Sequence, residues 1–297
     1  MGLLKTNFIF SIITNISNFL KKIKLQSLYG FSLYELFSLY FTGILKGAIS
    51  TRAGSISFSF FMAFFPFVLF VLNLIPFFPI ENFDKIFLDL LESLLPQEST
   101  VFFHDIFLDI NSNKRSGLLS STLLFSIILI GNGVNSVFEG FSDSYHVEFS
   151  RNFIKQYLYA IMVGFILVLV VLFATVMSIF FDFLITKNIS IISYFFVYFK
   201  YIFLIIVALI VFSSLYFFGT IQGRNLQFIS PGSIMTTFLL IITTYFFGLY
   251  IENFSNYNEL YGSIGALIIM MLYIWINSIS LLLGFELNVV IYKLKNH

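Results

Sequence analysis

Six apolar runs, each more than 20 residues long, constrain the fold of this chain more than any other feature of its sequence. An α-helix needs about 20 residues to cross the hydrocarbon core of a bilayer, which is about 30 Å thick. The runs cover residues 53–79, 118–138, 157–181, 196–218, 231–251 and 263–291. We therefore expect an all-α integral membrane protein with six transmembrane helices.

The composition supports this fold class and excludes others. Apolar residues make up 59% of the chain and charged residues 10%, whereas soluble domains average about 45–50% and about 25%. The net charge of +1 argues against a protein that binds nucleic acid through positive charge. The sequence has no cysteine, which excludes disulfides, thiolate metal sites and a cysteine nucleophile.

The basic residues predict the orientation in the membrane. Of the 16 Lys and Arg residues, 11 fall on the side of the predicted spans that holds the N-terminus and five on the other. Cytoplasmic loops carry such an excess, so we expect both termini in the cytoplasm of a bacterium, with the chain in its inner (plasma) membrane. The predicted parts are an amphipathic, basic N-terminal segment (residues 1–34), one membrane domain (35–292) and a cytoplasmic tail (293–297).

Residues 81–113, between the first two spans, have a different pattern. Apolar residues recur there at helical spacing, opposite acidic ones, and the pattern restarts after Pro96. This spacing is typical of amphipathic helices that lie in the membrane interface. We expect two such helices between the first and second spans.

Polar residues on the first two spans suggest a candidate site. Ser55 and Ser59 follow Arg52 along one face, and Asn132, Asn135 and Glu139 share one face of the second span. One interpretation is a polar cavity that opens to the cytoplasm, with Arg52 and Glu139 as its charged members. The other is hydrogen bonding that joins the helices, in which Glu139 pairs with Arg52 or Arg151.

The last span adds further polar and small residues. Glu286 and Asn288 lie near its inner end, where they either contribute to the cavity or cap the last turn, with Lys293 as a partner. Glycines allow helices to approach closely, and we interpret those of this region as a packing motif: Gly262, Gly265 and Gly284. At the fifth span, Ser230 is the predicted N-cap and Pro231 the first helical residue.

No metal site, cofactor site or catalytic motif is predicted. The three histidines are scattered, and the one beside acidic residues, His104, fits a solvated amphipathic face better than a metal site. The sequence shows no pattern typical of a hydrolase, a metalloprotease or a nucleotide-binding loop. We therefore do not expect an enzyme.

Three stretches of the chain carry more specific motifs. They are Arg52-Ala53-Gly54-Ser55-Ile56-Ser57-Phe58 with Phe65-Pro66, then Tyr145-His146-Val147-Glu148 with Arg151 and Phe153, and Tyr261-Gly262-Ser263-Ile264-Gly265-Ala266 with Trp275 and Leu283-Gly284-Phe285-Glu286-Leu287-Asn288. Together with six spans, they resemble the YihY/BrkB family of bacterial inner-membrane proteins, once labelled ribonuclease BN. The resemblance covers roughly residues 35–292.

The resemblance implies six helices with cytoplasmic termini and does not imply a settled activity. The chain departs from the family pattern at two places. It has Phe141-Ser142-Asp143 where the family commonly has Leu-Asn-Arg, and Ser59 where the family often has Tyr.

Two functions are compatible with these features. The first is transport or flipping of a lipid-like or envelope-precursor substrate across the bilayer. The alternative is a scaffold or assembly factor for envelope integrity, with envelope proteins as partners. A ribonuclease is disfavoured, because the sequence has neither a metal-nuclease cluster nor a basic groove for RNA. The oligomeric state is left open.

Overall fold

The computed structural model describes residue 21 and residues 32–74, 116–144, 152–187, 191–220, 227–253 and 263–295. Within these ranges the chain forms seven helices and no strand. They are α2 (Leu33–Lys46), α3 (Ile49–Leu74), α6 (Ser116–Ser142), α7 (Phe153–Lys187), α8 (Ile191–Gly219), α9 (Pro231–Asn253) and α11 (Ser263–Lys295). The predicted helical class is confirmed, and each predicted span coincides with one helix over its described residues.

Five of the described helices have a stretch that is long and apolar enough to cross a membrane. These stretches are Leu124–Ser142, Phe153–Ile185, Tyr194–Gly219, Pro231–Ile251 and Leu267–Lys295. Helix α3, the first predicted span, is not among them, so the count of six spans and the orientation of the termini stay predictions. The predicted interfacial helices in residues 81–113 lie outside the described residues.

Helix α2 was not predicted, and local signals at both of its ends explain it. The Ser32 side chain accepts a hydrogen bond from the Glu35 backbone N–H, and the Glu35 side chain bonds back to the Ser32 N–H, which forms a capping box. The helix ends at Lys46 with Gly47 as its C-cap, and Ala48 has a left-handed φ of 45° before α3 begins. This break turns the chain from α2 into α3.

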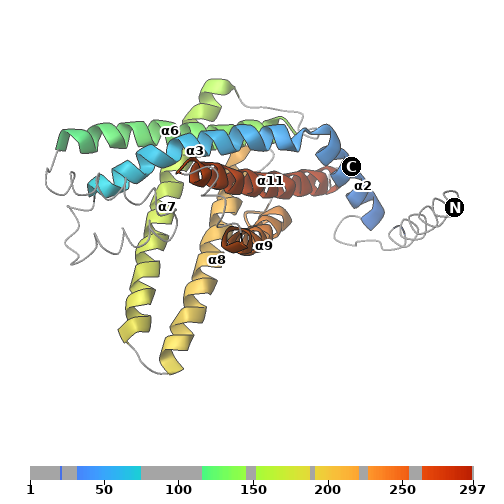
Figure 1. The fold of residues 1–297 in the computed structure, drawn as a ribbon. Coiled ribbons are helices and arrows are strands. Elements are labelled where there is room, and N and C mark those ends of the chain that lie inside the picture. The colour runs from blue at the N-terminus through green and yellow to red at the C-terminus, as the bar shows by residue number, and fades with distance from the viewer. Residues whose placement is uncertain are drawn as a thin grey trace.

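The core lies where α3, α6 and α11 run side by side (Figure 1). Fully buried side chains from α6 and α11 meet there, and the rings of Phe141 and Phe285 stack with centroids 4.2 Å apart. Helix α3 continues through Pro66 without a break. The Pro66 carbonyl accepts a hydrogen bond of 2.8 Å from the Ser126 hydroxyl of α6.

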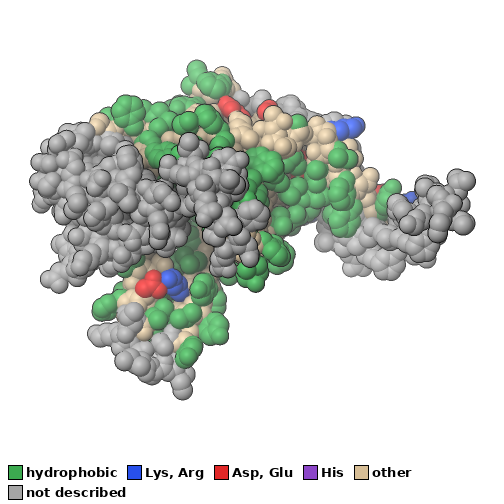
Figure 2. Space-filling model, viewed as in Figure 1, with side chains coloured by type: hydrophobic (Ala, Val, Ile, Leu, Met, Phe, Trp, Pro, Cys, Tyr) green, Lys and Arg blue, Asp and Glu red, His purple; other side chains and the backbone are tan. Residues whose placement is uncertain are grey.

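Helices α7 and α8 pack against each other and extend away from this core (Figure 1). In the most apolar stretch of α7, only 22% of the residues are buried, and in the corresponding stretch of α8 none are. Figure 2 shows hydrophobic side chains over much of the described surface. Such a surface suits contact with lipid tails, which are themselves apolar.

Candidate functional site

A buried ion pair joins α3 and α11. The Nη2 atom of Arg52 lies 2.7 Å from Oε1 of Glu286, and the two side chains are 6% and 0% exposed. The Nη1 atom of Arg52 donates a 2.7 Å hydrogen bond to the Gly140 carbonyl near the end of α6. Ser144, just beyond α6, donates to Oε2 of Glu286 at 2.9 Å. One arginine and one glutamate thus connect three helices.

The position of Arg52 has an electrostatic reason. The last carbonyls of a helix carry partial negative charge, which favours a cation at its C-terminal end. Arg52 lies against the end of α6 and beside a carboxylate, so both neighbours attract its positive charge. Its Nε atom is buried and has no hydrogen-bond partner among the described residues.

The turn between α2 and α3 must leave room for this pair. A Cβ atom added at Gly47 would lie 2.7 Å from Nη2 of Arg52 and 3.5 Å from Oε1 of Glu286.

Tyr40 of α2 is also buried, and burial together with the charge of Glu286 raises the pKa of its phenol to about 12. Tyr40 is therefore neutral at physiological pH.

The predicted polar face of α6 is divided between different neighbours. Asn135 donates to Oε1 of Glu139 at 2.8 Å and accepts from Gln156 of α7 at 3.3 Å. Glu139 thus bonds within its own helix, while Arg52, one of the two partners proposed for it, bonds to Glu286. The other proposed partner, Arg151, lies outside the described residues.

The other predicted residues of α3 and α6 have different surroundings. The hydroxyls of Ser59 and Ser136 are 2.7 Å apart and connect α3 with α6. By contrast, the side chains of Asn132 and Ser55 are exposed. Asn135 and Ser59 therefore hydrogen-bond to neighbouring helices, and both the cavity and the packing interpretation stay predictions.

Asn288 corrects another part of the sequence interpretation. Instead of capping its own helix beside Lys293, it binds the start of α9. Its Oδ1 accepts from the Gly232 backbone N–H, and its Nδ2 donates to the Ser230 hydroxyl, both at 2.8 Å. The Ser230 hydroxyl also accepts from the Ser233 N–H at 3.2 Å, which confirms the predicted N-cap. Glu286 likewise pairs with Arg52 rather than with Lys293.

Gly284 lies where α11 crosses α9 at close range. A Cβ atom at Gly284 would collide with the Thr236 hydroxyl and lie 2.6 Å from the Gly232 carbonyl. The Tyr216 hydroxyl of α8 donates to the Leu281 carbonyl at 2.7 Å and lies 2.5 Å from the Thr236 hydroxyl. Sequence reasoning missed this contact between three helices, because neither Tyr216 nor Thr236 stands out in an apolar run.

The remaining predicted positions fall at or beyond the edges of the described ranges. Gly265 lies in the first turn of α11, where the surroundings of the residue are not described. Gly262, Tyr145 and Arg151 lie outside the described residues. All three histidines lie outside them too. Within the described part of the chain, no group of three or more His, Asp or Glu side chains could hold a metal ion.

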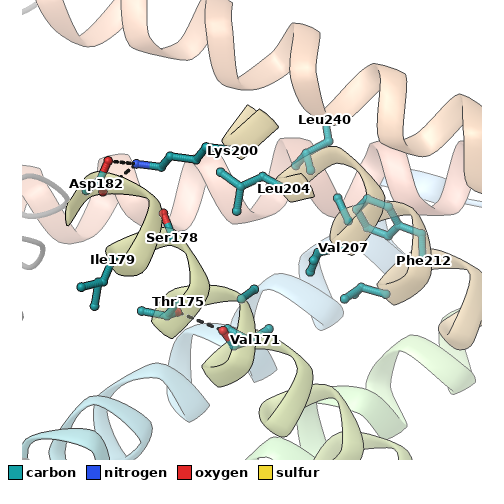
Figure 3. Close-up of a pocket in the computed structure, with 13 residues that line it drawn as sticks. Val171, Thr175, Ser178, Ile179, Asp182, Lys200, Leu204, Val207, Phe212 and Leu240 are labelled. Atoms are coloured by element: carbon teal, nitrogen blue, oxygen red, sulfur yellow. Dashed lines mark hydrogen bonds and ion pairs between the residues drawn. The ribbon is translucent and has the colours of Figure 1, made fainter. Parts of the chain in front are cut away.

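A second candidate site lies between α7 and α8, and Leu240 of α9 also lines it, near Leu204 (Figure 3). It is a groove of about 700 Å³ whose walls are mostly apolar. At one end, Nζ of Lys200 lies 2.7 Å from both carboxylate oxygens of Asp182. The apolar lining includes Val171, Ile179, Leu204, Val207 and Phe212.

The sequence contained a signal for this groove that we did not use. Lys200 is the single charged residue of α8, and Asp182 stands near the end of the apolar stretch of α7. Ionisable residues within apolar spans are rare and usually paired. An acid and a base on consecutive spans, both near the connection between them, therefore indicate a pair.

Comparison with known proteins identifies relatives. The family model described as "Virulence factor BrkB" matches residues 40–297. The Bacillus subtilis (strain 168) protein named "Putative ribonuclease-like protein YfkH" is 29% identical over 274 residues, which cover 89% of this chain and 96% of that protein. A UPF0761 membrane protein of Xanthomonas oryzae pv. oryzae (strain PXO99A) is 39% identical over 57 residues, 19% of this chain and 13% of the relative. No solved structure gives a significant match.

The family match includes nearly all of the described helices. It begins within α2 and includes both residues of the buried ion pair, Arg52 and Glu286, as well as the groove between α7 and α8. The resemblance inferred from three sequence motifs is thereby confirmed. The chain belongs to the BrkB family of membrane proteins.

Proposed function

We propose that this protein transports or flips a lipid-like molecule or envelope precursor across the bacterial inner (plasma) membrane, with both of its termini in the cytoplasm. It does so without covalent chemistry on the substrate. The observation that carries this proposal is the groove between α7 and α8, which has apolar walls and a charged pair at one end. An amphiphile has the same division into an apolar body and a charged head.

The placement of the charges supports this function. A charged side chain within an apolar helix is costly in lipid and usually marks a functional position or a partner. Lys200 and Asp182 pair with each other at one end of the groove, not in the packed core. The charged end of a substrate would meet them there while its apolar part lies along α8.

The rest of the structure provides a fixed support for such a groove. Buried hydrogen bonds and an ion pair join α3, α6 and α11, whereas the surface of α7 and α8 is mainly apolar and exposed. A bilayer would cover that surface. A lipid could then enter the groove sideways, without first passing through water.

Transport can be tested with purified protein in liposomes that contain a fluorescent phospholipid. Dithionite bleaches only the label in the outer leaflet, so lipid movement between leaflets increases the bleached fraction. We expect faster loss of fluorescence with protein than in empty liposomes. The same rate in both, with folded protein, would contradict the proposal.

A groove-blocking variant makes the test specific. Val207→Trp places a large side chain among the lining residues, and we expect it to abolish most of the flux. Ile206→Trp is the matched control, because Ile206 precedes it on α8, is 49% exposed and is not part of the lining. Equal loss in both variants would mean that the groove is not the path.

The second candidate function is a membrane scaffold or assembly factor. It is favoured by the Ser59–Ser136 hydrogen bond and by the bonding of Asn135 to Gln156, since these polar groups join helices. Deletion of residues 81–113 discriminates the two functions. If the protein is a scaffold that binds its partners there, the deletion should abolish their co-purification while the helical core stays folded.

A further inference from the structure

The ion pair at the groove is accessible, although it lies within apolar helices. The Asp182 side chain is 56% exposed and that of Lys200 is 21% exposed. The surrounding stretch of α8, Tyr194–Gly219, is long and apolar enough to cross a membrane. A pair this exposed contributes little to stability, so its placement beside a groove suggests a role in binding.

The part of α8 that follows Lys200 is long enough to cross the hydrocarbon core by itself, which would put Lys200 at a membrane boundary. Gly219 lies 19 residues after Lys200, which is about 29 Å of helix at 1.5 Å per residue, close to the hydrocarbon thickness of about 30 Å. The groove follows α8 from Lys200 to Val211 and Phe212, a rise of about 17 Å, or roughly one leaflet. An acyl chain of one leaflet would therefore fit along the groove with its headgroup at Lys200.

The two charges can bind a headgroup without separating. A lysine ammonium has three N–H donors and a carboxylate about four acceptor positions, and two of the donors point to Asp182. A phosphate would be attracted to Lys200, and an ammonium group to Asp182. Ser178 lines the groove one helical turn from Asp182, towards the apolar end (Figure 3), where the ester groups of a phospholipid would lie.

We infer that the groove between α7 and α8 binds a phospholipid whose headgroup carries both a phosphate and an ammonium group, such as phosphatidylethanolamine. The phosphate lies at Lys200, the ammonium at Asp182, and one acyl chain lies along Leu204 and Val207. This inference rests on the proposed function, because it names the class of substrate. A purely anionic lipid binds less tightly, since Asp182 repels it.

Lipid binding can be measured by native mass spectrometry of the purified protein in detergent. The probes are phosphatidylethanolamine and phosphatidylglycerol with identical acyl chains. We expect the wild-type protein to bind phosphatidylethanolamine about tenfold more tightly, the effect of one charge-assisted hydrogen bond. Equal affinities, or tighter binding of phosphatidylglycerol, would overturn the inference.

Single substitutions test separately the proposed contact of the ammonium group with Asp182 and that of the phosphate with Lys200. Asp182→Asn should remove the preference, because phosphatidylethanolamine loses the partner of its ammonium group and phosphatidylglycerol is no longer repelled. Lys200→Gln should weaken the binding of both lipids. Lys200→Arg keeps the charge and should retain the preference. The matched control is Lys155→Gln at the opposite end of α7, where the side chain is exposed and distant in sequence from the groove. A full preference in folded Asp182→Asn would overturn the inference.

Combined with the liposome assay, these measurements separate the two proposals. A headgroup preference without lipid movement would support the binding site and contradict the transport function. Lipid movement without any preference would support transport and overturn the assignment of the headgroup.

Discussion

Two ion pairs in this protein have the same N–O distance of 2.7 Å but opposite surroundings. Arg52 and Glu286 are 6% and 0% exposed and join three helices, whereas Lys200 and Asp182 are 21% and 56% exposed and join α7 with α8. Distance alone therefore does not reveal the role of a pair. Burial does, because it decides whether a lost partner can be replaced by water or by a ligand.

The Arg52–Glu286 pair holds the helices of the core together, whereas the Lys200–Asp182 pair lies at a surface where other groups can bind. Removal of one partner from a buried pair leaves an uncompensated charge in an environment of low polarity. At the exposed pair, water or a lipid headgroup can take the vacated position. This difference predicts unequal responses to the same kind of substitution.

The largest expected effect is that of Glu286→Ala. It leaves the Arg52 guanidinium buried without its counter-charge, so we expect a loss of about 3–5 kcal/mol of stability. Unfolding of the purified protein by increasing SDS in mixed micelles measures it. The double variant Arg52→Met with Glu286→Met, which buries no charge, should be more stable than Glu286→Ala. A loss below about 1 kcal/mol for Glu286→Ala would contradict the role of the pair.

The next effect concerns the crossing of α9 and α11. In Gly284→Ala the new methyl group would collide with Thr236 and the Gly232 carbonyl, and we expect a loss of about 1–3 kcal/mol from overpacking. Gly248→Ala on α9 is the control, because a Cβ there meets nothing within 4 Å. The same unfolding measurement should show Gly248→Ala unchanged or slightly stabilised. Equal losses of stability in Gly284→Ala and Gly248→Ala would mean that α9 and α11 do not approach closely at Gly284.

A smaller effect is expected for the hydrogen bond between Ser59 and Ser136. Hydrogen bonds between membrane helices contribute about 0.6 kcal/mol on average. A double-mutant cycle with Ser59→Ala and Ser136→Ala should give a coupling free energy of about this size. A coupling near zero would mean that the two hydroxyls do not join α3 and α6.

The smallest effect on stability is expected at the exposed pair. Lys200→Ala should change the free energy of unfolding by less than about 1 kcal/mol, since exposed pairs contribute little. The same substitution should still weaken lipid binding, because the phosphate loses its cation. If Lys200→Ala destabilises the protein as much as Glu286→Ala does, the contrast between the two pairs is wrong.

The helices were largely predictable because each apolar run must satisfy its backbone hydrogen bonds internally in lipid. Ser230 and Pro231 even marked the start of α9 to the residue. Helix α2 was missed because its signal is a local capping box in an amphipathic segment, not a long apolar run. The groove was missed because its walls are mostly ordinary apolar residues on different helices.

The sequence by itself determined the helical class, the family and the importance of individual polar residues, including Arg52, Glu286 and Asn288. Their partners were decided only by the tertiary structure. Glu286 lies 234 residues from Arg52, and Asn288 lies 56 from Gly232, far beyond the spacing of three or four residues that a single helix reveals. Helical periodicity shows which face a side chain occupies, but packing decides which helix that face meets.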